Sequence, residues 1–176
     1  MTKMKTLMML AALLSTATAA SAQNPMSDSL RTSWNGVKQN IKASAELMPE
    51  EHYAFKPTPD VRSFGEILAH VAGASYMLCA AAKGEKSPFG EASFEQTAKT
   101  KAQIVKATND AITYCDGAFA ALTDANAGAQ VTSPFGGGQV PRANPLISQI
   151  GHDNEHYGNL VTYFRLKGLV PPSSRR

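Results

Sequence analysis

The sequence contains little of what marks several common kinds of functional site. It has only two cysteines, Cys79 and Cys115, and they lack the C-x-x-C spacing of a thiol redox motif. Its 17 basic and 14 acidic residues nearly balance, and the basic ones are scattered among the acids, which argues against a nucleic-acid partner. No stretch of useful length alternates apolar and polar residues as a half-buried strand does. The sequence therefore favours an all-helical protein.

Residues 1–22 have the organisation of a secretory signal peptide. Lys3 and Lys5 give a charged start, residues 7–14 are an uncharged apolar run, and residues 20–22 form a small-x-small cleavage site. The apolar run is too short to remain in a bilayer as a permanent anchor, and a buried N-terminal helix explains the pattern less well. We therefore expect an exported protein that is periplasmic or secreted.

Cleavage after Ala22 leaves residues 23–176, a length that fits one domain with a substantial core. Because the removed segment carries two lysines and no acid, 15 basic and 14 acidic residues remain, and the net charge is +1. Export permits a disulfide. Cys79 and Cys115 each lie late in a predicted helix, so both a bridge between helices and a pair of free buried thiols remain open.

Four segments carry apolar residues at the spacing of an amphipathic helix. Ser63 and Glu66 form a capping box at the start of the second segment. Ser93 starts the same pattern at the third segment, and Asn144 with Pro145 fits the cap and first turn of the fourth. Together the segments predict an all-α four-helix bundle. The predicted helices are residues 27–48, 63–83, 93–122 and 144–168.

The segment between the last two predicted helices, residues 125–145, is rich in glycine, asparagine and proline. It contains a glycine triplet at residues 136–138, and such triplets can cradle a phosphate group. Here no Lys-Ser/Thr pair follows the triplet and no predicted strand precedes it, as a phosphate-binding loop requires. We therefore expect a flexible loop.

Two histidines four residues apart, His152 and His156, are the most specific chemical feature of the sequence. On a helix this spacing places both imidazoles on one face, one turn apart, where they can bind the same divalent metal ion. His70 lies on the apolar side of the predicted helix 63–83. Its side chain is either a third ligand or a hydrogen-bonded core residue, and the residues alone leave both possibilities open.

The same segment also fits the H-x-x-E-H pattern of inverted zinc proteases, in which a further acidic ligand follows downstream. No Asp or Glu follows Glu155, so the protease hypothesis lacks its third ligand. Asp153 is able to accept a hydrogen bond from a histidine N–H in an outer shell. We nevertheless expect both acids to be exposed.

Residues 63–72 and 152–173 resemble the DinB family of metal-dependent four-helix proteins, also called DinB/YfiT-like. Residues 49–57 resemble the segment that leads into the second helix of that family. The resemblance covers nearly all of residues 23–176. It implies a bundle of up-down-down-up type whose connection after residue 83 carries the chain back across the bundle.

The resemblance also implies a divalent metal ion held by His70, His152 and His156. Zinc or nickel suits three imidazoles best, and iron or manganese is also compatible. Three protein ligands leave open positions for water or substrate, which is the layout of a catalytic site. Nitrogens that share one ion at about 2.1 Å should lie roughly 3–3.5 Å from one another.

The leading hypothesis is an exported, metal-dependent enzyme of hydrolase or transferase type that acts on an unknown small molecule. Characterised relatives in the wider superfamily use low-molecular-weight thiols, which are scarce outside the cytoplasm. The catalytic residues are unknown. Tyr157 or His52 is a candidate for a pocket wall, but ordinary packing or a surface position explains each of them better. The alternatives are a non-enzymatic metal- or ligand-binding protein of the cell envelope and a purely structural bundle. Exposed helix faces would also allow a homodimer.

Overall fold

We describe the chain from a computed structural model in which residues 23–90 and 93–175 are placed. The predicted signal peptide lies outside these described residues. Four long helices dominate the described part, and short helices and one hairpin join them. The elements are α1 (Pro25–Leu47), η1 (Glu50–His52), α2 (Phe64–Lys83), α3 (Phe94–Thr97), α4 (Lys101–Ala121), β1 (Gln130–Thr132), β2 (Gln139–Pro141), α5 (Ala143–Leu166) and η2 (Pro172–Ser174).

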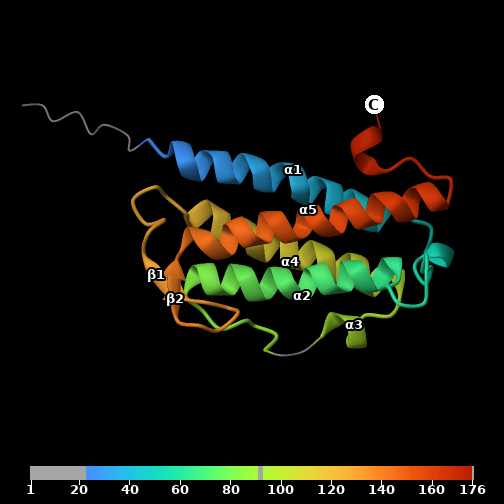
Figure 1. The fold of residues 1–176 in the computed structure, drawn as a ribbon, viewed down its shortest axis with the longest axis horizontal. Helices are drawn as coiled ribbons and strands as arrows, with labels where there is room; N and C mark the ends of the chain where they lie inside the picture. The colour runs from blue at the N-terminus through green and yellow to red at the C-terminus, as the bar shows by residue number, and fades with distance from the viewer. Residues whose placement is uncertain (1–22, 91–92, 176) are drawn as a thin grey trace, which may run out of the picture.

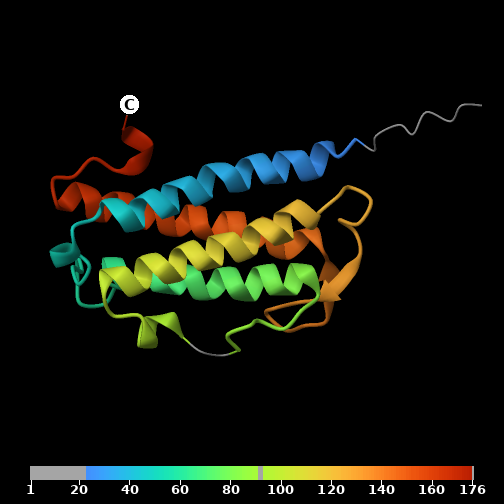
Figure 2. The ribbon, with the colours of Figure 1, turned by 180° about the vertical axis from the view of Figure 1, so that it is seen from behind.

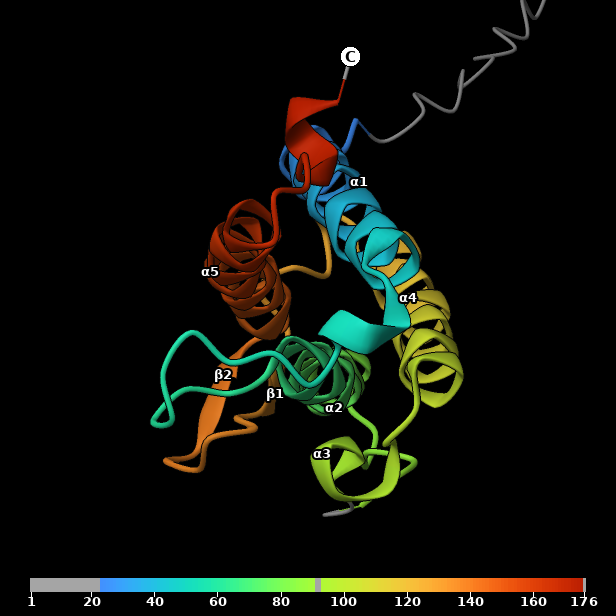
Figure 3. The same ribbon diagram turned by 90° about the vertical axis from the view of Figure 1, so that its right-hand side faces the viewer.

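The long helices form an up-down-down-up bundle, which confirms the predicted fold class. α1 and α5 run in one direction, and α2 and α4 run in the opposite direction (Figure 1, Figure 2). The connection between α2 and α4 returns along the outside of the bundle and contains α3. Viewed along the bundle, α2 lies beside both α4 and α5, and α3 lies outside α2 (Figure 3).

The start of α2 matches the prediction, but the start of the third long helix does not. Ser63 and Glu66 make a complete capping box, whereas the side chain of Ser93 makes no cap hydrogen bond. α3 is only one turn long, and the long helix α4 begins after Thr100, which shares a complete capping box with Gln103. The prediction of one helix over residues 93–122 was therefore wrong, because two similar capping patterns follow each other and the second one is used for the long helix.

Replacing Thr100 with alanine should lower the free energy of unfolding by about 1 kcal/mol, because the N–H of Gln103 loses its acceptor. The matched control is Ser93→Ala, which removes no cap hydrogen bond and should cost less than about 0.5 kcal/mol. Urea unfolding followed by circular dichroism measures both. Equal losses for the two variants would contradict this assignment of the helix start.

The beginning of α5 also differs from the prediction. The residue at the cap is Arg142, without a side-chain cap hydrogen bond, and Asn144 lies inside the first turn. Pro145 follows there at little cost, since the first-turn N–H groups of a helix have no partner within the helix. The general position of the helix was predicted correctly, but its cap was not.

The expected flexible loop before α5 contains a β-hairpin. β1 and β2 pair antiparallel, with Val131 opposite Val140, and Val131 is buried. The hairpin turn contains Gly136, Gly137 and Gly138, all at positive φ, a conformation that glycine adopts without steric cost. The triplet thus serves to turn the chain, and two three-residue strands were too short to be predicted from alternation.

The core of the bundle is apolar and includes the single tryptophan. Trp34 stacks on Phe119 with a centroid distance of 4.8 Å, and its indole N–H donates to Asp116 at 2.6 Å. α2 is apolar and long enough to cross a membrane by composition, but 67% of its apolar stretch is buried inside the bundle, as expected of a core helix. The largest fully buried side chains are Trp34, Phe64, Phe119, Phe164, Ile41, Met48, Leu68, Leu78, Leu122, Leu146, Leu160 and Gln149.

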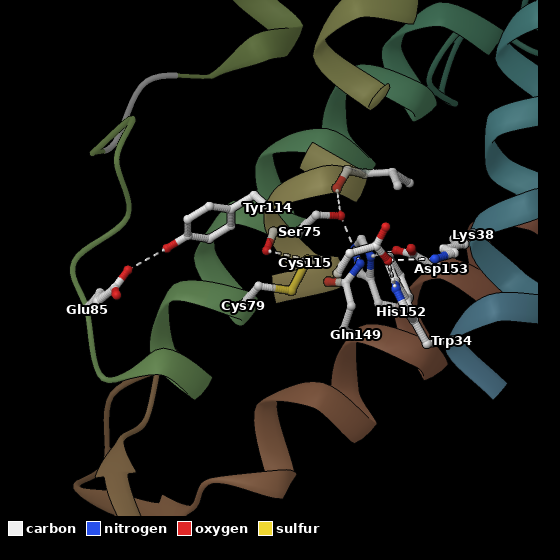
Figure 4. The surroundings of a disulfide bond; sticks show 12 residues. Trp34, Lys38, Ser75, Cys79, Glu85, Tyr114, Cys115, Gln149, His152 and Asp153 are labelled. Atoms are coloured by element: carbon white, nitrogen blue, oxygen red, sulfur yellow. Dashed lines mark hydrogen bonds and ion pairs between the residues drawn. A yellow bond between two sulfur atoms is a disulfide. The ribbon is translucent and has the colours of Figure 1, made fainter. Parts of the chain in front are cut away.

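A disulfide joins the two parallel helices α2 and α4. It links Cys79 to Cys115, and both residues are fully buried (Figure 4). The structure thus decides between the two possibilities that the sequence left open for these cysteines.

Candidate metal centre

Three of the four histidines meet between α2 and α5. His70 projects from the first half of α2, and His152 and His156 project from the middle of α5. Since α2 and α5 are antiparallel neighbours, the single histidine of one helix faces the pair of the other. The Nε2 atoms of His70 and His152 lie 3.1 Å apart. The structure therefore brings together the three residues that the sequence selected.

The three possible ligand atoms all lie within 4.8 Å of one another. The separation of His70 and His152 falls in the range expected for two ligands of one ion. The full spread is wider than the roughly 3–3.5 Å expected around a shared ion. Binding of one ion through all three nitrogens would therefore require the imidazoles to move closer together.

Burial favours the uncharged form of two of these imidazoles, those of His70 and His156. It is the main cause that lowers the pKa of His156 to about 4, and the neighbouring His152 and His70 lower it further. It also lowers the pKa of His70, with Arg62 and His152 as further causes. Neutral imidazoles carry the lone pair that a metal ion requires.

The donor set fits a transition metal ion in a second respect. Nδ1 of His156 is buried and makes no hydrogen bond within the described residues. Buried polar atoms of this kind are rare in folded proteins, and each calls for a partner. A buried ring nitrogen without a partner, next to two further imidazoles, is the chemistry of a nitrogen-rich site for zinc or nickel.

A glutamate from outside the bundle contacts His70. Glu95 belongs to α3, and its Oε1 lies 3.1 Å from Nδ1 of His70. Its Oε2 accepts a hydrogen bond of 2.9 Å from Nε of Arg62. The sequence analysis missed Glu95, because it assigned residue 95 to the first turn of a long helix, where an acid is common and carries no signal of a site.

A second carboxylate lies beside His152, within α5 itself. Oδ1 of Asp153 is 3.4 Å from Nδ1 of His152, and only 1% of the residue is exposed. Burial raises the pKa of the Asp153 carboxyl, and His152 acts in the opposite direction. The expectation of an exposed Asp153 was wrong because this part of α5 is turned toward the core. Glu155 is exposed, as predicted.

Further buried polar groups surround the same turn of α5. Gln149 donates a hydrogen bond of 2.8 Å to the hydroxyl of Ser75 on α2. This hydroxyl in turn donates to the carbonyl of Val71. The side chains of Gln149 and Ser75 lie next to the disulfide and close to His152 and Asp153 (Figure 4). Their hydrogen bond connects α5 to α2 one turn before His152.

A cavity of about 790 Å³ adjoins the histidine cluster. Its wall is formed by the segment between η1 and α2, by the start of α2, by Glu95 and by one side of α5. Tyr157 and His52 are not among its lining residues, in line with the packing or surface position that the sequence favours for them. The Tyr157 hydroxyl accepts a hydrogen bond from the N–H of Ser173. The lining residues are Lys56, Pro57, Thr58, Pro59, Asp60, Val61, Arg62, Glu66, Ile67, Glu95, Glu155, His156, Asn159, Thr162 and Tyr163.

These features define a four-helix bundle protein with a cluster of three histidines that is able to hold a metal ion between its second and last long helices. Residues 34–160 match the DinB superfamily. Because this match covers more than half of the chain, the protein belongs to the DinB superfamily. No curated protein matches the sequence.

Solved structures share the fold at low sequence identity. A DinB-like protein from Bacillus cereus has 16% identity and a TM-score of 0.66, over 82% of this chain and 95% of that chain. A DinB-like protein from Bacillus subtilis has 18% identity and a TM-score of 0.66, over 84% and 99%. The mycothiol-dependent maleylpyruvate isomerase has 14% identity and a TM-score of 0.62, over 76% of this chain and 60% of that chain. At such identities the likeness shows the fold alone.

Proposed function

We propose that this protein binds one divalent transition metal ion through His70, His152 and His156, and that it is an exported, metal-dependent enzyme of hydrolase or transferase type. The observation that carries the proposal is the meeting of three imidazoles from two helices beside a cavity. Zinc or nickel suits these ligands best, with iron or manganese as further options. The substrate is a small molecule that fits the cavity.

The ion, when bound, supplies the ability to polarise a substrate oxygen or to lower the pKa of a bound water or thiol. The residues of the chain then have separate tasks. The three imidazoles hold the ion and leave part of its coordination sphere open. His156 lies in the cavity wall, so a molecule in the cavity approaches the cluster from its side.

The fold likeness and the proposed location of the protein favour different types of reaction. The likeness to a mycothiol-dependent isomerase supports a reaction that uses a low-molecular-weight thiol. An exported location speaks for hydrolysis instead, since low-molecular-weight thiols are scarce outside the cytoplasm. The Cys79–Cys115 disulfide is consistent with export, because disulfides persist in oxidising compartments.

The second candidate function is a non-enzymatic metal- or ligand-binding protein of the cell envelope. It is favoured by the pairing of the basic side chains in the cavity wall. Lys56 pairs with Glu66 at 3.1 Å, and Arg62 pairs with Glu95 at 2.9 Å. Both basic side chains are thus already paired with carboxylates of the protein. This suits a site that only binds a ligand better than a site that stabilises charge during a reaction.

Metal content is the first test of the proposal. The purified protein, dialysed against zinc and then against metal-free buffer, should retain about one equivalent of zinc by elemental analysis, and His152→Ala should retain less than a tenth. The control is His52→Ala, which removes the one histidine outside the cluster and should leave the zinc content unchanged. Loss of zinc in both variants, or in neither, would contradict the assigned ligand set.

The same preparations separate the two candidate functions. Zinc-loaded protein is assayed with panels of ester, amide and thiol-transfer substrates, and an enzyme should lose its activity in His152→Ala and keep it in His52→Ala. Activity that persists in His152→Ala would argue against metal-dependent chemistry. The mass of the chain recovered from the cell envelope tests export, because cleavage after Ala22 leaves Gln23 as the first residue.

A further inference from the structure

The contact between Glu95 and His70 involves the ring nitrogen that faces away from the centre of the cluster. Nε2 of His70 is the atom that lies 3.1 Å from Nε2 of His152, whereas Glu95 lies 3.1 Å from Nδ1. The two nitrogens of an imidazole point in different directions. Glu95 therefore contacts the cluster from behind His70 and does not compete with it for the central position.

We propose that Glu95 is the positioning residue of His70. Its carboxylate accepts the Nδ1–H of the ring, which leaves the lone pair on Nε2 directed toward the centre of the cluster. Which nitrogen of a neutral imidazole carries the proton is set by the hydrogen bond that the other nitrogen makes. The role in metal binding rests on the function proposed above, whereas the choice of tautomer does not.

Neighbouring residues hold both the carboxylate and the backbone of Glu95. Arg62 donates from Nε to Oε2 at 2.9 Å and from its terminal nitrogen to Oε1 at 3.5 Å. Lys99 donates to the backbone carbonyl of Glu95 at 2.6 Å. The preceding residue, Phe94, packs on Tyr76 with a centroid distance of 5.8 Å. These contacts fix α3 on the outside of α2, with the carboxylate of Glu95 beside Nδ1 of His70.

The single helical turn between α2 and α4 holds this carboxylate in place. The four-residue helix α3 contributes no buried residue, and its partly buried Phe94 packs from outside against the core cluster that contains Tyr76. The helix delivers one carboxylate to one metal-ligand candidate. Carboxylate partners of this kind orient a ligating histidine and raise its basicity, and their loss typically weakens metal binding 10–100-fold.

The first test reads the tautomer of His70 in the metal-free protein. Imidazole ¹⁵N chemical shifts recorded near pH 8 should show His70 protonated on Nδ1 in the wild type. Glu95→Ala should shift the population toward Nε2–H. Glu155→Ala is the matched control, since it removes an acid from the wall of the same cavity and should leave the tautomer unchanged. An Nδ1–H tautomer that persists in Glu95→Ala would overturn the proposal.

The second test measures the affinity for Zn²⁺ alone, by competition with a chromophoric chelator. Glu95→Ala should bind Zn²⁺ about 10–100-fold more weakly than the wild type. Glu155→Ala should change the affinity less than about threefold, since Glu155 is exposed and water and salt screen an exposed charge. Glu95→Gln should recover part of the loss, because its amide oxygen is able to accept the same hydrogen bond.

The outcomes of this second test distinguish the two proposals. Equal losses for Glu95→Ala and Glu155→Ala would show an effect of net charge and would overturn the role of Glu95 in metal binding. A wild-type protein that binds no Zn²⁺ would overturn the proposed function. In that case the tautomer measurement still decides whether Glu95 positions His70.

Discussion

Removing the disulfide between Cys79 and Cys115 should lower the free energy of unfolding by about 3–4 kcal/mol. The bridge closes a segment with a sequence separation of 36 residues, and it restricts the unfolded chain by the entropy of closing a loop of that size. For a domain of this length the loss corresponds to a fall in Tm of roughly 6–16 °C. Chemical unfolding with and without a reductant measures the difference.

The design of this experiment follows from the burial of both sulfur atoms. Because the bridge is fully buried, a reductant reaches it mainly from unfolded protein, so samples must be reduced in denaturant before they refold. Cys79→Ala/Cys115→Ala is the genetic counterpart, and it should lose somewhat more because it also removes buried volume. A change below about 1 kcal/mol on reduction would mean that the bridge does not constrain the unfolded chain as expected.

Binding of zinc should raise the stability of the wild-type protein by about 4 kcal/mol when free zinc exceeds its dissociation constant a thousandfold. The corresponding rise in Tm is about 8–16 °C. His156→Leu should abolish this rise. In the absence of metal, however, the same variant should be more stable than the wild type by about 1 kcal/mol, because it removes a buried nitrogen without a partner.

The informative result is that His156→Leu should be less stable than the wild type with zinc and more stable than it without metal. A core histidine with a purely structural role would lose stability on replacement under both conditions. Differential scanning calorimetry with a chelator and with buffered zinc measures both states. His52→Leu serves as the control for changing a histidine outside the cluster, and it should keep the rise in Tm. Loss of the zinc effect in both variants would contradict the ligand assignment.

The pH dependence of the metal-free protein follows from the same residue. The pKa of His156 is lowered to about 4 in the folded state, and it returns to about 6.5 when the chain unfolds. The folded state therefore binds fewer protons in this range, so stability is complete above about pH 6.5 and falls as the pH decreases toward 4. His156→Leu should lose less stability over the same interval.

The sequence predicts those parts of the fold that depend on neighbouring residues along the chain. The capping box at Ser63 and the apolar stripes of α1, α2 and α5 were confirmed. The spacing of His152 and His156 indicated a shared helix face. Their meeting with His70 was implied by the resemblance to the DinB family, because the residues alone left His70 open as a third ligand or a core residue. Residues three or four apart on a helix lie on the same face. The spacing of two histidines along the sequence is therefore enough to predict that their side chains lie together.

The features that escaped prediction depend on contacts between distant parts of the chain. Glu95 reaches His70 only because the connection after α2 folds back over that helix. Asp153 is buried by the packing of α5 against the core, although its side chain is acidic and follows a histidine on the same helix. The hairpin before α5 has three-residue strands, which are too short for alternation to be recognised.

The position of Glu95 separates the site into parts that can change independently. The three histidines lie on α2 and α5, whose exposed and buried faces are constrained by the core. The carboxylate behind His70 comes from a surface connection that contributes no buried residue through α3. A change in the length or sequence of this connection would therefore alter the surroundings of one histidine without altering the two helices that carry the three histidines.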